Sequence, residues 1–289
     1  MGNEMQNKIV MVTGATNGIG LESAKALAGM GATIVGVGRN PQKCADVAAQ
    51  IKSATGNSKV EFLVADLSVQ AQVRQLAATF KQKYSRLDVL LNNAGGYFSK
   101  RETNADGQEL TWALNHLNYF VLTNELLDVL KASAPARIVN VSSMAHSGAK
   151  GIHFEDVEFK TGYSGWSAYS HSKLANVMFT YELARRLAGT KVTANALHPG
   201  FVATGFGHNN SGGLMAFGLN ALQMIVAKKP EQGAATSIYL ASAPQVEGVT
   251  GKYFSNSKEA KSSAASHDVD AQKRLWTLSE QMVGAKVTA

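Results

Sequence analysis

A tyrosine and a lysine four residues apart, Tyr169 and Lys173, form the pattern Y-x-x-x-K within a stretch of helical periodicity, residues 168–187. Because four residues span about one helical turn, the two side chains share a face of that helix. A phenol has an ordinary pKa of about 10, and an ammonium beside it stabilises the phenolate and lowers that pKa. The pair is therefore suited to protonating a carbonyl oxygen or deprotonating an alcohol. The same spacing also occurs on many exposed helices, so the rest of the chain must supply the context.

A glycine-rich turn joins a predicted strand to a predicted helix near the N-terminus. Residues 8–12 are an apolar run typical of a buried strand, residues 13–20 read T-G-A-T-N-G-I-G, and helical patterning begins at Leu21. Glycines let backbone N–H groups approach an anion, and the helix N-terminus adds a favourable dipole. This order predicts a phosphate site with the spacing G-x-x-x-G-x-G, not the better-known G-x-G-x-x-G. A plain flexible turn is the alternative.

The residues after the second predicted strand, residues 32–38, indicate the type of nucleotide. Dinucleotide-binding folds usually place an acidic residue there, where it binds the adenine-ribose hydroxyls. This chain has Arg39 and Asn40 instead. An arginine can pair with a 2′-phosphate through two charge-assisted hydrogen bonds, whereas an acid would repel it. We therefore expect NADP rather than NAD, unless Arg39 is only a surface cation.

Two polar residues each have two interpretations. Asp66, at the end of a strand predicted at 60–65, could accept from an adenine amine or cap the helix predicted at 69–84. Asn115 lies among apolar neighbours in a long helix predicted at 108–131. Such an amide is either a satisfied core group or a functional one, and taken alone the core interpretation is favoured.

Strands and helices alternate along the rest of the chain. Small and polar residues follow three further predicted strands (87–91, 137–141 and 192–197): N-N-A-G-G at 92–96, Ser142-Ser143, and His198-Pro199-Gly200. The remaining predicted elements are helices at 41–53, 231–241 and 268–283 and a short strand at 252–254. This alternation predicts an α/β fold with one doubly wound parallel sheet and helices on both faces. Right-handed crossovers bring the glycine-rich turn and the three strand ends to one edge of the sheet. No repeat or linker divides the chain, so we expect a single domain over 1–289, with its core at 7–256.

Composition excludes several other classes of protein. The net charge is +7, from 28 basic and 21 acidic residues, but the basic residues are scattered, which indicates a solvated surface and no nucleic-acid partner. No apolar run reaches the roughly 18 residues that span a bilayer, and the N-terminus lacks the apolar core of a signal peptide. A single cysteine, Cys44, fits a reducing compartment. We expect a cytoplasmic protein without a membrane anchor.

Taken together, the ordered motifs resemble the short-chain dehydrogenase/reductase family over roughly residues 7–256. The motifs are T-G-x-x-x-G-x-G at 13–20, N-N-A-G at 92–95, Asn115, Ser143, Y-x-x-x-K at 169–173 and P-G at 199–200. Residues 138–147 and 172–202 are most similar to its retinol-dehydrogenase-like branch, including the spacing of 26 residues between Ser143 and Tyr169.

The resemblance implies hydride transfer with NADPH and a role for each motif. Tyr169 would be the general acid for reduction, and Lys173 would lower its pKa and bind the nicotinamide ribose. Ser143 would hydrogen-bond the substrate oxygen, and Asn115 would hold a water that links Lys173 to solvent. The other implied cofactor contacts are Gly14, Asn17, Gly18, Ile19 and Gly20 at the pyrophosphate, Arg39 at the 2′-phosphate, Asp66 and Leu67 at the adenine, Asn93 at the adenosine ribose, and Val202 and Thr204 at the carboxamide, with Thr16, Asn40, Ala94, Gly95, Pro199 and Gly200 beside them. No metal site is expected.

The expected substrate is an uncharged, hydrophobic ketone, aldehyde or alcohol. The candidates for its pocket wall are mostly apolar: Gly96, Tyr97, His146, Trp166, Phe201, Phe206 and Met215. Residues 205–213 are rich in glycine and asparagine, which predicts a mobile lid over 205–227. The apolar part, 214–227, could instead be a core helix or a membrane-dipping segment.

Two other functional classes remain open: a cofactor-binding regulatory protein that has lost its chemistry, and an epimerase or dehydratase with the same fold. The intact set of Tyr169, Lys173, Ser143 and Asn115 argues against the first.

By analogy with the family, we expect a homodimer or homotetramer that pairs through the helices at about 106–131 and 167–188, although longer loops could block a tetramer.

Overall fold

The computed structural model describes residues 4–200 and 229–284. The predictions made for Phe201, Val202, Thr204, Phe206, Met215 and the lid at 205–227 lie outside these residues. The sheet has eight strands in the order β3-β2-β1-β4-β5-β6-β7-β8. Their bounds are β1 Ile9–Thr13, β2 Thr33–Gly38, β3 Val60–Val64, β4 Val89–Asn92, β5 Ala136–Val141, β6 Val192–Leu197, β7 Tyr253–Ser255 and β8 Lys258–Ala260. Every neighbouring pair is parallel except β7–β8, which is antiparallel.

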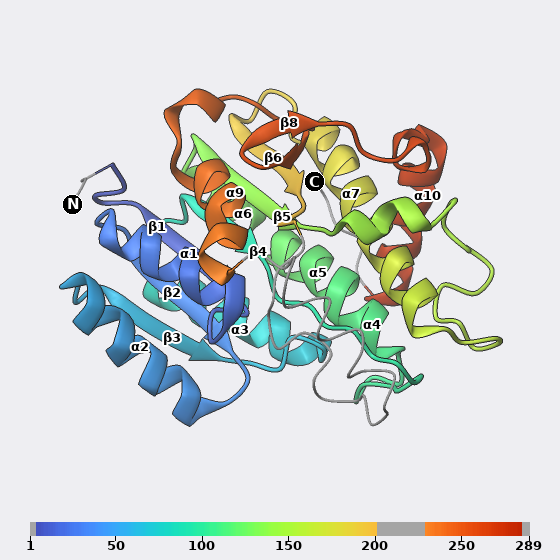
Figure 1. The fold of residues 1–289 in the computed structure, drawn as a ribbon, viewed down its shortest axis with the longest axis horizontal. Coiled ribbons are helices and arrows are strands. Elements are labelled where there is room, and N and C mark those ends of the chain that lie inside the picture. Colours follow the sequence, from blue (N-terminus) through green and yellow to red (C-terminus); the bar gives the residue numbers. More distant parts are fainter. Residues whose placement is uncertain (1–3, 201–228, 285–289) are drawn as a thin grey trace.

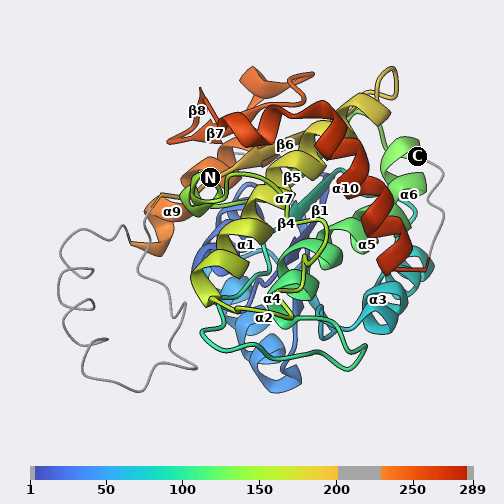
Figure 2. The same ribbon diagram turned by 90° about the vertical axis from the view of Figure 1, so that its right-hand side faces the viewer.

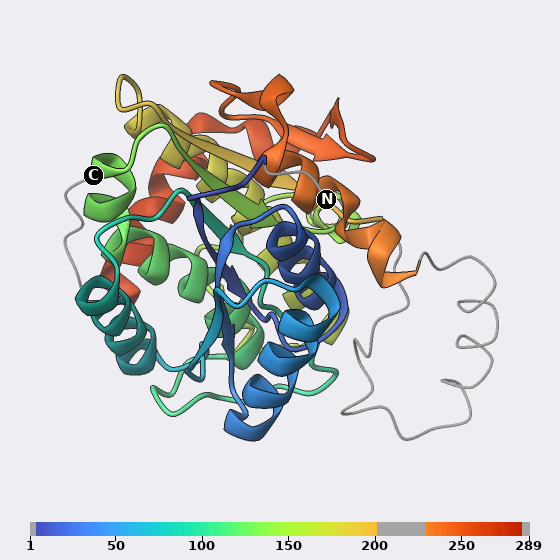
Figure 3. The ribbon, with the colours of Figure 1, turned by 90° about the vertical axis from the view of Figure 1, so that its left-hand side faces the viewer.

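Helices cover both faces of this sheet, as the alternation predicted (Figure 1). The α-helices are α1 Gly18–Gly29, α2 Pro41–Thr55, α3 Gln70–Lys83, α4 Leu110–Trp112, α5 Asn118–Glu125, α6 Leu127–Ala132, α7 Gly165–Arg186, α9 Pro230–Ser242 and α10 Val269–Met282. One apolar core joins α1, α2 and α9 to the sheet, and a larger one lies beneath α3, α5, α7 and α10. Figure 3 shows the blue α1 and α2 on the opposite side of the sheet from the teal α3 and the red α10. The α/β fold with a doubly wound sheet is thus confirmed.

The helix predicted at 108–131 is not continuous. The chain forms α4, then a π-helix, η1 Ala113–Leu117, then α5, and it breaks at Leu126 before α6. A π-turn adds a residue to the local turn and often occurs at functional sites. Periodicity could not show it, because the residues from Ala113 to Thr123 are nearly all buried and no face stands out.

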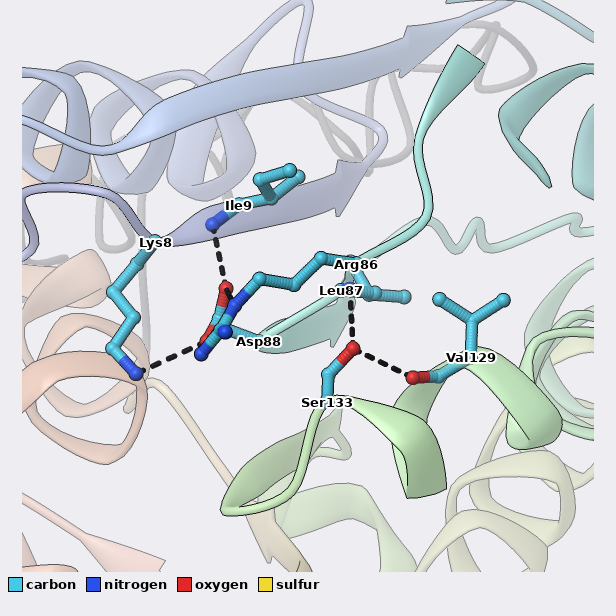
Figure 4. A network of polar contacts seen from close by, with 7 residues as sticks. All are labelled: Lys8, Ile9, Arg86, Leu87, Asp88, Val129 and Ser133. Carbon is cyan, nitrogen blue, oxygen red and sulfur yellow. Dashed lines mark hydrogen bonds and ion pairs between the residues drawn. The ribbon is translucent and has the colours of Figure 1, made fainter. Parts of the chain in front are cut away.

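At the amino edge of the sheet, Asp88 forms a buried polar centre (Figure 4). Its carboxylate accepts hydrogen bonds from the Lys8 ammonium at 3.0 Å, the Arg86 guanidinium and the Ile9 amide at 2.9 Å. Close by, the Ser133 hydroxyl accepts from the Leu87 amide and donates to the Val129 carbonyl. These contacts tie β1 and β4 together at the end opposite to the predicted site.

The C-terminal helix α10 packs along α7 (Figure 2). Trp276 lies against the rings of Phe120 and Phe179 at 4.9 and 5.8 Å between centroids, and the Arg186 guanidinium covers its other face. Residues 168–184 of α7 are all buried within the chain. The predicted homo-oligomer, which would pair through this helix, stays a prediction. In the ranges the structure describes, no helix has the length and apolarity to cross a membrane.

Candidate active site

The carboxyl ends of β1, β4, β5 and β6 meet at one edge of the sheet. The register pairs Val12 with Leu91, Asn92 with Asn140, and Val141 with Leu197, so the residues that follow these strands become neighbours. The glycine-rich turn, the 92–96 segment, Ser143 and the Pro199–Gly200 turn therefore gather there, as the topology predicted.

The glycine-rich turn has the backbone that a pyrophosphate requires. Gly14 and Gly18 have φ of 65° and 51°, in the left-handed region that favours glycine. A Cβ at Gly20 would lie 2.3 Å from the Gly14 carbonyl oxygen, so only glycine lets α1 start this close to β1. The N-cap Asn17 makes no side-chain capping bond, which leaves the first-turn amides for a ligand. These features fit a dinucleotide phosphate group.

Thr13, the last residue of β1, holds the segment that follows β4. Its hydroxyl accepts hydrogen bonds from the Asn93 amide at 2.8 Å and the Ala94 amide at 3.0 Å. The Asn93 side chain in turn donates to the Thr13 carbonyl at 2.8 Å. Asn93 and Ala94 thus lie against the Gly14 turn, where a Cβ on Gly14 would meet the Ala94 Cα at 3.0 Å. The Asn93 side chain therefore has a bracing role that the sequence did not indicate.

The adenine end of the cleft is only partly as predicted. Arg39 is exposed directly after β2, and Thr16 packs so close to Gly38 that a Cβ there would lie 2.4 Å from its methyl group. The Asn40 side chain accepts from the Lys43 amide at 2.9 Å and caps α2. Leu67 is buried in the core, and its contact with the adenine stays a prediction.

The interpretation of Asp66 as a helix cap is wrong. The N-cap of α3 is Val69, and the Asp66 carboxylate instead accepts from the amide and hydroxyl of Ser68 at 3.0 and 2.7 Å. A carboxylate two residues before its partner amide forms a local turn of its own, so the helix starts later.

Tyr169, Ser143 and Lys173 lie close together near the carboxyl edge of the sheet, where Ser143 follows β5. The Ser143 hydroxyl acts on the Tyr169 phenol and lowers its pKa, and it accepts a hydrogen bond from the Ala145 amide at 3.2 Å. The Lys173 amine lies 5.7 Å from the centre of the Tyr169 ring and donates to the Val141 carbonyl at 3.2 Å. Tyr169 and Lys173 are 8% and 3% exposed, so both titratable groups are nearly removed from water. The helical spacing thus placed the pair correctly.

The predicted acidification of the phenol by the ammonium differs from what the structure shows. Burial raises the pKa of Tyr169 to about 12, and the Ser143 hydroxyl acts in the opposite direction. Burial also lowers the pKa of Lys173 to about 7. Loss of hydration disfavours the charged form of each group, and it is the largest cause of both shifts. At neutral pH Tyr169 therefore keeps its proton.

Asn115 lies on the π-helix η1 and is fully buried. Its Oδ1 accepts from the Gly96 amide at 2.7 Å, and its Nδ2 donates to the Gly96 carbonyl at 3.0 Å and the Ser172 hydroxyl at 2.9 Å. A Cβ on Gly95 would meet the Asn115 Oδ1 at 2.9 Å and the Lys173 Nζ at 3.3 Å. Asn115 is thus a satisfied core amide that lies close to Lys173, and its functional role stays a prediction.

The candidate pocket wall divides into two groups. Tyr97 lies edge-on to the Tyr169 ring at 6.0 Å, and Trp166, 58% exposed, lies 6.5 Å from it. Gly96 is held by Asn115 beside them, as described above. His146, by contrast, is buried beneath the Ser143 loop with both ring nitrogens close to polar partners, so its assignment to the pocket wall is wrong. At the cleft's far side, the Gly200 amide donates to the His198 Nδ1 at 3.1 Å.

Three supporting residues were not recognised in the sequence. Thr13 fastens two strand ends, the Ser142 hydroxyl donates to the Lys173 carbonyl at 2.7 Å, and the Ser172 hydroxyl donates to the Tyr169 carbonyl at 2.8 Å. Their only signal was proximity to the motifs, since a small hydroxyl residue beside a motif has many ordinary uses.

Comparison with known proteins gives the same fold and chemistry. A sequence model of the family described as "short chain dehydrogenase" matches residues 8–213. The chain is 41% identical to mouse retinol dehydrogenase 14 over 293 residues, which cover 97% of this chain and 87% of that protein. It is also 41% identical to human polyprenol dehydrogenase over 284 residues, 96% and 86% of the two chains. The solved RhlG/NADP active-site complex of Pseudomonas aeruginosa is similar at 29% identity, with a TM-score of 0.71 and coverage of 87% and 95%.

Proposed function

The chain belongs to the short-chain dehydrogenase/reductase family, an oxidoreductase family that interconverts alcohols and carbonyls with NAD(P), and on that basis we propose that it reduces a hydrophobic aldehyde or ketone with NADPH. The observation that carries this proposal is the buried Tyr169 phenol, on which the Ser143 hydroxyl acts, with the buried Lys173 amine 5.7 Å from the centre of its ring. A protein that only senses a cofactor has no need of that arrangement.

In this proposal Tyr169 is the proton donor, and Ser143 binds the substrate oxygen. With a pKa raised to about 12, Tyr169 is protonated at neutral pH and can give its proton to an oxygen on which negative charge develops. The Ser143 hydroxyl would hold that oxygen by a hydrogen bond. NADPH, when bound, supplies the hydride. Val141 and Asn115 keep the Lys173 amine and the Gly95–Gly96 backbone in place around the reacting centre.

Arg39 supports NADP over NAD. It follows β2 directly, at the place where an acidic residue would repel a 2′-phosphate, and it is exposed to solvent. The similarity to a protein solved as an NADP complex agrees with this choice.

The cleft mouth supports an apolar substrate. Two of the large exposed apolar side chains of the described residues, Met144 and Trp166, follow Ser143 and precede Tyr169 in the chain. Trp166 and Tyr97 both lie against the Tyr169 ring. Two of the similar proteins are named for retinol and polyprenol, which are long apolar alcohols. We infer that the substrate is a long apolar aldehyde such as retinal or a polyprenal.

The proposal is tested by following oxidation of NADPH and of NADH against a panel of carbonyl compounds. The panel contains retinal, a polyprenal, a short aldehyde and an anionic 2-oxo acid. We expect turnover with NADPH at a higher kcat/KM than with NADH, and a preference for the two long apolar aldehydes. A preference for the anionic compound, or product formation without stoichiometric consumption of NADPH, would contradict it; the latter would favour an epimerase or dehydratase.

A further inference from the structure

His146 is a buried polar residue beside the candidate site, and both nitrogens of its ring contact other groups of the chain. It lies on the short 3₁₀ helix η2 Met144–Gly148, which Ser143 caps, and it is 2% exposed. Its Nδ1 lies 2.7 Å from the Ser143 carbonyl oxygen, and its Nε2 accepts from the Ser263 amide at 3.0 Å. The ring therefore joins the Ser143 loop to the segment that follows β8.

The Ser263 contact determines which ring nitrogen carries the proton. A backbone amide can only donate, so the Nε2 of His146 must be the acceptor and unprotonated. In a neutral imidazole the proton is then on Nδ1, which donates it to the Ser143 carbonyl. The Tyr253 hydroxyl, 3.3 Å from Nδ1, makes a longer second contact, and its ring packs on the imidazole at 4.9 Å between centroids. Burial lowers the pKa of His146, which favours this neutral form.

The Ser143 carbonyl thus receives two hydrogen bonds, one from the His146 ring and one from the His146 amide at 3.1 Å. The Ser143 hydroxyl is the group that acts on the Tyr169 phenol and lowers its pKa. We propose that His146 is a positioning residue for Ser143, holding its backbone so that its hydroxyl meets both Tyr169 and the substrate oxygen. This inference rests on the proposed carbonyl reduction.

Two amide substitutions separate the two ring contacts. The amide of Asn lies near the position of a histidine Nδ1, and the amide of Gln lies near the position of Nε2. His146→Asn keeps a donor for the Ser143 carbonyl, whereas His146→Gln keeps a partner for Ser263 and loses that donor. We expect kcat to fall by less than about tenfold in His146→Asn and on the order of 10²-fold in His146→Gln. The Kd for NADPH, measured by fluorescence, should stay within about twofold in both. The reverse order, or an equal loss in kcat and in cofactor affinity, overturns the proposal.

A double-mutant cycle separates positioning from a general loss of stability. In a Ser143→Ala background His146 has no hydroxyl left to place, so His146→Gln should cost less than about threefold there. The same 10²-fold loss in both backgrounds would show that His146 acts independently of Ser143. If His146→Gln fails to fold, the protonation of the His146 ring in the wild-type protein, measured as described below, still decides the proposal. Ser263→Pro tests the other ring contact: Ser263 has φ of −62°, which proline adopts, and the change removes the amide donor and the hydroxyl, so like His146→Asn it should cost less than about tenfold in kcat. Ser263→Ala, which keeps the amide, is its matched control.

A readout that needs no turnover keeps this test independent of the proposed function. Nitrogen-15 NMR of the histidine rings should show His146 protonated at Nδ1, and the Tyr169 ring-carbon resonance should shift in His146→Gln but not in Ser263→Ala. An absence of wild-type turnover with these spectra as expected would overturn the proposed function alone. A proton on Nε2, or an unshifted Tyr169 resonance, would overturn the positioning role.

Discussion

The Nζ of Lys173 donates a hydrogen bond to the carbonyl oxygen of Val141, the last residue of β5, at 3.2 Å. Through this contact Lys173 reaches across from α7 to the end of a strand. The amine is almost fully removed from water, and burial lowers its pKa from 10.5 to about 7. Keeping a lysine there therefore reduces the stability of the fold, as is common for residues retained for catalysis.

Lys173→Met should increase the free energy of unfolding and abolish turnover. Between about pH 7 and 10.5 the unfolded chain holds a proton that the folded chain has lost, so wild-type stability rises with pH across that window. Methionine removes this dependence, and the Val141 carbonyl still accepts from the Tyr119 hydroxyl. We expect a gain of about 0.5–2 kcal/mol at pH 7 by urea denaturation. Lys150→Met, at an exposed position, is the control. A destabilised Lys173→Met protein would show that the amine contributes net stability.

Gly95→Ala should disable the site while leaving the fold intact. The added Cβ would lie 2.9 Å from the Asn115 Oδ1 and 3.3 Å from the Lys173 Nζ, so one of these groups must move. A displacement of this size can cost on the order of 10²-fold in kcat. Steady-state kinetics and circular dichroism measure the two effects. The matched control is Gly151→Ala, whose Cβ would meet nothing within 4 Å; equal losses in both variants would refute the steric explanation.

Much of this site followed from residue order, because the glycine-rich turn, the 92–96 segment and Ser143 come at the ends of strands whose positions the alternation fixes. Helical spacing in turn puts Tyr169 and Lys173 on one face of α7. The phosphate turn, Ser143 and the Tyr169–Lys173 pair all lie where the topology put them. The π-helix around Asn115 did not follow, since a single inserted residue in a fully buried helix leaves no trace in polarity. The pKa shifts of Tyr169 and Lys173 did not follow either, because spacing along a helix reports proximity and not burial. His146 was misplaced for a related reason: the sequence does not show that Ser263, more than a hundred residues away, meets its ring.

Trp166→Ala should weaken binding of long apolar aldehydes in particular. The exposed indole lies beside the Tyr169 ring, and such an aromatic contact is worth about 0.5–1.5 kcal/mol. KM for retinal should rise about five- to tenfold, while kcat/KM for a short aldehyde should change little. Trp166→Phe, which keeps a ring, should behave nearly as wild type. An equal effect on long and short aldehydes would place Trp166 outside the substrate path.

Asp88→Asn should destabilise the fold without affecting turnover, because Asp88 lies at the opposite edge of the sheet. Burial by itself would raise the pKa of Asp88, but hydrogen bonds from Arg86, Ile9 and Lys8 lower it overall. Its contribution is therefore present above about pH 4 and is lost as the pH falls through the lowered folded pKa. We expect a loss of about 1–3 kcal/mol at pH 7 that shrinks in acid, measured by urea denaturation. Asp46→Asn, on the surface of α2, is the control, and a pH-independent difference would contradict this account.

Replacing the phenol by a phenyl ring tests the central claim most directly. Tyr169→Phe removes one oxygen, and Tyr84→Phe, which removes a hydroxyl bonded to Glu61 of the edge strand β3, serves as the matched control. NADPH binding and NADPH oxidation with retinal are measured on all three proteins. We predict a fall in kcat of at least about 10²-fold for Tyr169→Phe alone, with cofactor affinity nearly unchanged. Undiminished turnover by Tyr169→Phe would contradict the assignment of the Tyr169 phenol as the proton donor.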